Sequence, residues 1–139
     1  MAIFVYNKNE ESHDRDKNVY DICRPSILSN PYTHLDLKKT RATYRVSTRE
    51  EAIEKYAHYF DTMYSGNTEF KTVVDEIYEK FKDGEDIYLG CVCKPLPCHG
   101  DIIAKKITSR YIKENFLKNF SLHSRDFSRE LSEKKNKKT

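Results

Sequence analysis

The segment 86–93, Asp-Ile-Tyr-Leu-Gly-Cys-Val-Cys, restricts the fold of this chain more than any other. It is a short, mostly apolar run that follows Gly84 and precedes a proline-rich stretch, which predicts a buried central strand. Apolar patterns of helical period lie on both sides of it. A buried strand between helices indicates an open α/β domain, and such domains bind ligands beyond the carboxyl ends of their strands.

The helices around this strand are predicted from apolar spacing and from their ends. Thr48 and Glu51 have the spacing of a capping box, and Gly66 ends the first helix. A second helix is expected between Gly66 and Gly84, with Asn67 or Thr68 as its cap. Apolar residues from 102 to 120 predict one helix or two abutting helices after the strand. Further short strands are predicted at 1–6, 18–23 and 42–46.

The length and charge of the chain favour one domain with a tail. At 139 residues we expect a single domain, 1–122, and a charged, basic tail, 123–139. Between Arg125 and Thr139 there are six basic and three acidic residues, and this difference of three equals the whole net charge of +3. A solvated tail explains this basic excess better than nucleic-acid binding, which is therefore not expected.

The sequence has no feature of a membrane or secretory protein. No stretch approaches the roughly 18 apolar residues that a spanning helix needs, and the first residues lack the basic start of a signal peptide. We therefore expect a cytoplasmic protein without membrane partners. Its four cysteines should be reduced thiols or metal ligands, and its oligomeric state stays open.

Residues 91–100, Cys-Val-Cys-Lys-Pro-Leu-Pro-Cys-His-Gly, lie between the predicted central strand and the next helix. Three interpretations compete for Cys91, Cys93, Cys98 and His99. A zinc site has the right ligand types, although a single residue between the first pair is fewer than usual. The cysteines can also be small buried hydrophobes with a structural histidine. The junction of strand and helix favours the third interpretation, a ligand-binding or catalytic pocket.

As a pocket, this junction supplies several candidate groups. Cys98 and His99 would lie in the first turn of the helix, whose positive end lowers the pKa of a thiol and attracts anions. Cys98 is the candidate nucleophile, with Cys93 as the alternative. His99 or Asp101 is the candidate acid or base. Gly100 would let a ligand or a neighbouring backbone approach closely.

A second cluster, Arg-Pro-Ser-Ile-Leu-Ser-Asn-Pro-Tyr, begins at Arg24 just after a predicted strand. Arg24 can hold a carboxylate or phosphate through two parallel hydrogen bonds. Ser26 and Asn30 would orient a ligand by hydrogen bonds, and Tyr32 would stack on a base. The cluster forms one site with the cysteine motif only if parallel strands bring the two together.

Both clusters together resemble a family of small phage and bacterial domains of unknown function. The pattern of that family reads Gly-Arg-Pro-Ser-x-x-Gly-Asn-Pro-Phe, then a Thr-Arg-Glu-Glu-Ala helix start with a following Tyr, and finally Cys-x-Cys-x-Pro-x-x-Cys-His-Gly-Asp. This chain departs from it where Cys23, Ser29 and Tyr32 replace two glycines and the phenylalanine. The likeness extends from about Val19 to Ile107. The matching residues are Arg24, Pro25, Ser26, Asn30, Pro31, Thr48, Arg49, Glu50, Glu51, Ala52, Tyr56, Cys91, Cys93, Pro95, Cys98, His99, Gly100 and Asp101.

The resemblance implies a Rossmann-like three-layer α/β sandwich, with a small, mostly parallel sheet, helices on both faces, and a phage or prophage origin. It implies no established reaction. We expect a nucleotide-like anionic small molecule to be bound or processed in a pocket formed by the Arg24 cluster and the cysteine motif, and whether the protein is an enzyme stays open. The alternatives are a non-enzymatic protein that sequesters a signalling nucleotide in the host cytoplasm, and a zinc-stabilised protein that contacts nucleic acid or another partner.

Overall fold

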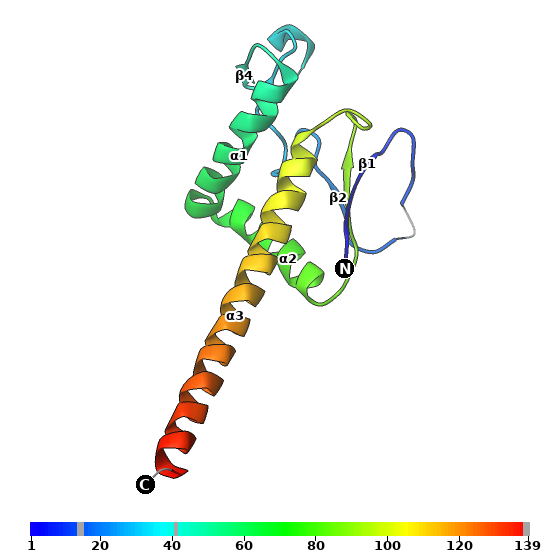
Figure 1. Ribbon diagram of the computed structural model, residues 1–139. Helices are drawn as coiled ribbons and strands as arrows, with labels where there is room; N and C mark the ends of the chain where they lie inside the picture. The colour runs from blue at the N-terminus through cyan, green and yellow to red at the C-terminus, as the bar shows by residue number, and fades with distance from the viewer. Residues whose placement is uncertain (14–15, 41, 138–139) are drawn as a thin grey trace. The chain divides into compact units, whose positions relative to one another are not determined.

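The computed structural model describes residues 1–13, 16–40 and 42–137, and this part of the chain divides into two compact units. The first unit, Met1–Ile107, holds the strands, the first two helices and the start of the last helix (Figure 1). That last helix is α3 (His99–Lys137), and its remainder from Thr108 onward belongs to the second unit. The boundary between the two compact units falls at Ile107, and the division into a domain, 1–122, and a tail, 123–139, stays a prediction.

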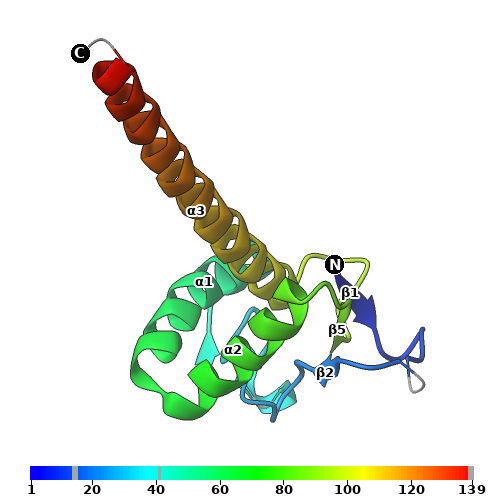
Figure 2. The same ribbon diagram turned by 90° about the horizontal axis from the view of Figure 1, so that it is seen from below.

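A three-stranded parallel sheet lies at the centre of the first unit. β1 (Ile3–Asn7) and β2 (Val19–Asp21) both pair in parallel with β5 (Ile87–Cys91), which lies between them (Figure 2). The predicted central strand and the mixed α/β class are thereby confirmed. Between β2 and the first helix the chain forms β3 (Tyr32–Thr33), the 3-10 helix η1 (Leu37–Lys39) and β4 (Tyr44–Arg45), and β3 pairs in parallel with β4.

Two helices, α1 (Arg49–Gly66) and α2 (Thr68–Lys82), precede β5 and begin at caps that the sequence predicted. The Thr48 hydroxyl accepts a hydrogen bond from the backbone N–H of Glu51 at 3.1 Å, and the Asn67 side chain caps α2 in the same way. None of the helices in the described part of the chain has the length and apolar character needed to cross a lipid bilayer.

α2 and the first turn of α3 contact one face of the three-stranded sheet. Leu89 of β5 is fully buried on this face, and its register partners Val5 and Tyr20 share the face because side chains alternate along a strand. Tyr20 accepts a hydrogen bond from Lys80 of α2 at 2.9 Å, and Val5 lies against Gly100 of α3. Both contacts are on the same face, so the described residues do not confirm the expected arrangement with helices on both faces.

The segment between β1 and β2 covers the opposite face. Phe4 and Tyr88 stack there with 5.3 Å between ring centroids. His13, from the connecting segment, stacks on Tyr88 at 4.5 Å and meets the ring of Tyr6 edge-on at 4.4 Å. This connection is short and polar and has no apolar pattern of helical period, so its sequence does not predict a helix on this face.

The His13 imidazole is expected to have a pKa above its ordinary value of 6.5. Its Nδ1 lies 2.7 Å from the Asp16 carboxylate and its Nε2 lies 3.1 Å from that of Glu11, and both contacts raise the pKa. The stability that these contacts add is present at low pH and is lost as the pH rises through the folded-state pKa. An NMR titration should show a pKa above 6.5 in the wild type and a lower one in Asp16→Asn. Equal pKa values in the two proteins would contradict the contact.

Candidate functional site

A cavity of about 190 Å³ opens at the carboxyl edge of the sheet. Its walls come from the end of β5, from the chain that leaves β2, and from the first turns of α1 and α3, all within the first unit. This is the edge at which open parallel sheets bind their ligands. The lining residues are 22–24, 30, 32–35, 49, 52–53, 91–93 and 97–99.

The cavity brings together the two clusters that the sequence singled out. Arg24 and His99, which are far apart in the chain, both line it. They meet because β2 and β5 are parallel neighbours, so the segments that leave their carboxyl ends lie side by side. Of the predicted site residues, Arg24, Asn30, Tyr32, Cys93, Cys98 and His99 are in the lining, whereas Ser26, Gly100 and Asp101 are outside it.

Ser26 and Asp101 have structural partners outside the cavity. The Ser26 hydroxyl accepts a hydrogen bond from the Leu28 N–H at 3.2 Å and so shapes the turn after β2. The Asp101 carboxylate accepts one from the Cys98 N–H at 3.1 Å and pairs with Lys94 at 2.6 Å. Asp101 is therefore a cap of α3, and its carboxylate is held away from the place where a cavity ligand would need an acid or base.

Arg24 donates most of its hydrogen bonds to its own loop. Its Nε donates to the Asn30 carbonyl at 2.9 Å, one Nη to the Thr40 hydroxyl at 3.0 Å, and the other to the Tyr32 carbonyl at 3.3 Å. Burial lowers the pKa of this guanidinium, which nevertheless stays charged at neutral pH. Arg24 thus positions the loop that forms one wall of the cavity, and only its remaining N–H groups are left for a ligand.

Asn30 also uses its side chain to position this wall. Its amide nitrogen donates to the Ala52 carbonyl in α1 at 3.1 Å, and its amide oxygen accepts from the Tyr32 N–H at 2.9 Å. The phenol of buried Tyr56 adds a third link, since it donates to the Leu28 carbonyl at 2.7 Å. The long loop after β2 is therefore fastened to α1 by buried hydrogen bonds.

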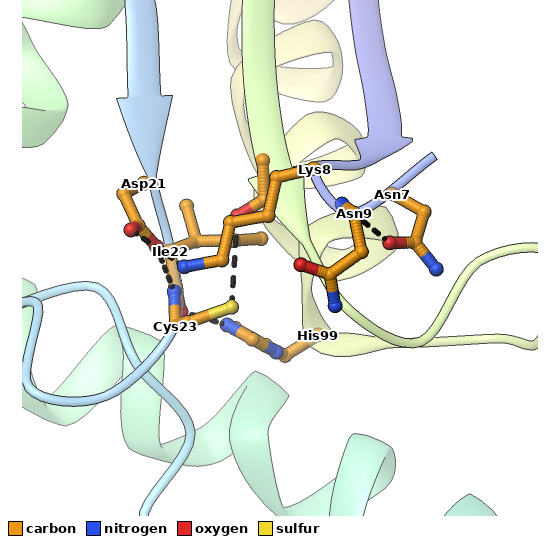
Figure 3. Close-up of polar contacts among 8 residues, drawn as sticks. Asn7, Lys8, Asn9, Asp21, Ile22, Cys23 and His99 are labelled. Carbon is orange, nitrogen blue, oxygen red and sulfur yellow. Dashed lines mark hydrogen bonds and ion pairs between the residues drawn. The ribbon is translucent and has the colours of Figure 1, made fainter. Parts of the chain in front are cut away.

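His99, the first residue of α3, is a neutral imidazole in this site. Its Nε2 lies 2.7 Å from the Ile22 carbonyl oxygen (Figure 3). A carbonyl can only accept, so Nε2 carries the proton and Nδ1 is an acceptor. Burial, with a smaller contribution from the neighbouring Arg24 charge, lowers the pKa of His99 to about 4, although the hydrogen bond to Ile22 acts in the opposite direction. His99 can therefore accept a hydrogen bond from a ligand but does not offer a positive charge at neutral pH.

The Cys98 thiol is protonated at neutral pH. Cys98 is buried, and burial raises its pKa, with the adjacent Cys91 thiol acting in the same direction. The prediction that the helix start lowers this pKa is wrong, because removal from water outweighs the hydrogen bond from the Gly100 N–H. Cys98 is consequently poorly suited to act as a nucleophile.

Cys23 contributes a further thiol at the end of β2. Its Sγ lies 3.9 Å from the Gly90 carbonyl oxygen, and burial raises its pKa to about 11 even though the Lys8 charge acts in the opposite direction. Lys8 itself forms an ion pair with Asp21 at 2.9 Å (Figure 3). The cavity is therefore lined here by a neutral thiol, not by a thiolate.

No zinc site is formed by the described residues. Among them, no group of three or more His, Cys, Asp and Glu side chains is arranged to hold a metal ion. The thiols of Cys91 and Cys98 contact each other, and the protonated Nε2 of His99 is committed to the Ile22 carbonyl. In this arrangement Cys91, Cys93, Cys98 and His99 are not grouped as a set of metal ligands, and the zinc alternative stays a prediction.

Arg49 lines the cavity although the sequence did not single it out as a site residue. It is the first residue of α1, directly after the Thr48 cap, and is half-buried. No residue in the described ranges forms an ion pair with it. The Thr-Arg-Glu-Glu segment marked a helix start, but only the packing of α1 against β3 brings that start to the cavity.

Comparison with known proteins connects this site to a family. The family model described as "Domain of unknown function (DUF4326)" matches residues 5–109, which include the whole lining of the cavity. The "Uncharacterized 12.4 kDa protein in nrdA-td intergenic region" of Enterobacteria phage T4 is 64% identical over 28 residues. That match covers 20% of this chain and only 25% of the phage protein. No solved structure matches the chain.

Proposed function

The chain belongs to the DUF4326 family of domains of unknown function, and we propose that its first unit binds a small anionic molecule of the nucleotide class. One observation carries the proposal: the lining of the cavity includes Arg24 and Arg49 but no Asp or Glu among the described residues. A partly buried cavity with cations and no carboxylate attracts a phosphate or carboxylate group.

The chemistry of the site supports binding rather than covalent catalysis. Burial raises the pKa values of Cys23 and Cys98, so neither thiol is a ready nucleophile, and the half-buried Cys93 in the lining is the one predicted nucleophile that remains. His99 is neutral, and its protonated nitrogen is bonded to a backbone carbonyl. Asp101 lies outside the lining. A protein that sequesters its ligand, as expected for a phage protein acting in the host cytoplasm, fits this set of groups better than a hydrolase or transferase does.

Arg49→Gln is expected to weaken the binding of phosphate-bearing probes by about 10- to 100-fold, because a hydrogen bond to a charged group contributes about 1.5–3 kcal/mol. Isothermal titration calorimetry of the full chain at pH 7 and low salt would compare inorganic phosphate, ribose 5-phosphate and uncharged ribose. The two phosphates should bind and ribose should not. Lys71→Gln is the matched control, because Lys71 is ion-paired with Asp75 on α2 and lies outside the cavity lining.

Two results would overturn the proposal. The first is a wild-type protein that binds neither phosphate probe at millimolar concentration. The second is an Arg49→Gln variant that binds as tightly as Lys71→Gln does. A folded variant is recognised in each case by an unchanged circular dichroism spectrum, so loss of binding is not confused with loss of structure.

A further inference from the structure

The cavity is too small for a whole nucleotide. Its volume of about 190 Å³ lies well below the ~300 Å³ at which pockets for complete small ligands usually begin. A nucleotide bound through its phosphate in the cavity must therefore leave its base outside. The surface next to the cavity then decides whether a base is recognised.

A pair of tyrosine rings lies at that position. Tyr32 in β3 lines the cavity and pairs in register with Tyr44 in β4. The two rings are 5.3 Å apart between centroids and are tilted by 30°. Tyr44 is 54% exposed, which is unusual for so large a ring and leaves much of it open to solvent. The ring of Tyr32 thus forms part of the cavity wall, and the exposed ring of Tyr44 packs directly against it.

The ring of Tyr32, against which Tyr44 packs, is supported by contacts from α1. The ring of Tyr59, from α1, meets it edge-on at 6.4 Å, and the Lys55 ammonium lies 5.9 Å from its ring centroid. The backbone carbonyl of Tyr32 is also held by Arg24. An aromatic surface fixed in advance loses little conformational entropy when a flat molecule stacks on it.

We infer that the ligand is a nucleoside 5′-phosphate whose phosphate enters the cavity beside Arg49 and whose base stacks on the exposed ring of Tyr44. Stacking on an aromatic side chain accepts any base, because every base presents a flat face. The Tyr32–Tyr44 pair therefore gives a preference for nucleotides over other phosphates, without selection among bases. This inference rests on the proposed function and adds to it where the phosphate lies and which side chain holds the base.

The test compares adenosine 5′-monophosphate with ribose 5-phosphate, which lacks the base. Wild-type protein is expected to bind the nucleotide about 5- to 100-fold more tightly. Tyr44→Ala should remove this difference and leave the affinity for ribose 5-phosphate unchanged, whereas Tyr44→Phe should keep it. Phe4→Ala is the matched control, because Phe4 is a similarly exposed ring on the face of the sheet that the helices do not contact.

The measured affinities distinguish a failure of base stacking on Tyr44 from a failure of phosphate binding in the cavity. Equal wild-type affinities for the nucleotide and ribose 5-phosphate would overturn the inference and leave phosphate binding intact. So would a Tyr44→Ala variant that retains the preference or loses affinity for both probes equally. If neither probe binds to wild-type protein, the proposed function itself fails.

Discussion

Between pH 7 and pH 4, His99 alone is expected to reduce the free energy of unfolding by about 3 kcal/mol. Burial holds the pKa of this imidazole at about 4 in the folded protein, against 6.5 for an exposed histidine. In this pH range the unfolded chain binds the proton and the folded protein does not. The contribution is therefore fully present above pH 6.5 and is lost as the pH falls to about 4.

His99→Gln is the variant that isolates this effect, because its amide N–H can still donate to the Ile22 carbonyl but does not titrate. Urea unfolding of both proteins should show the wild type losing about 3 kcal/mol more than the variant between pH 7 and pH 4. His13, whose protonation favours the folded state, is present in both proteins and cancels in the comparison. Parallel stability curves would show that His99 is not a buried neutral imidazole.

The features that the sequence predicted well depend on local residue patterns or on the parallel pairing of two strands. Thr48 and Asn67 cap their helices through hydrogen bonds that span three residues, and local spacing reveals such bonds. The central position of β5 followed from its apolar composition. The meeting of Arg24 with His99 followed in turn from parallel pairing at the carboxyl edge.

The features that the sequence missed depend on burial and packing. A helix start lowers the pKa of an exposed thiol, but Cys98 is 2% exposed, and desolvation reverses the sign of the shift. Arg24 has the chemistry of an anion binder, yet its donors were already required by the carbonyls of its own loop. Arg49 enters the cavity only because α1 packs against β3. Sequence spacing specifies none of these three outcomes.

The role of Gly100 also depends on packing that the sequence does not reveal. The sequence suggested that this glycine makes room for a ligand or for neighbouring backbone, but the structure places neighbouring side chains there. A Cβ atom at this position would lie 2.7 Å from the Val5 Cγ1 and 2.8 Å from the Ile22 Cδ1. Both distances are far inside van der Waals contact, so the start of α3 can approach the sheet this closely only without a side chain at residue 100.

Gly100→Ala is therefore expected to reduce the free energy of unfolding by about 1–3 kcal/mol, because the extra methyl group must displace packed side chains. Gly66→Ala is the matched control. It also replaces a helical glycine, but a Cβ there would meet no atom within 4 Å, so the change should be neutral or stabilising by up to about 1 kcal/mol. Urea unfolding followed by circular dichroism measures both. If Gly100→Ala keeps wild-type stability but no longer binds ribose 5-phosphate, the glycine serves the ligand after all, and the close contact between α3 and the sheet is incorrect.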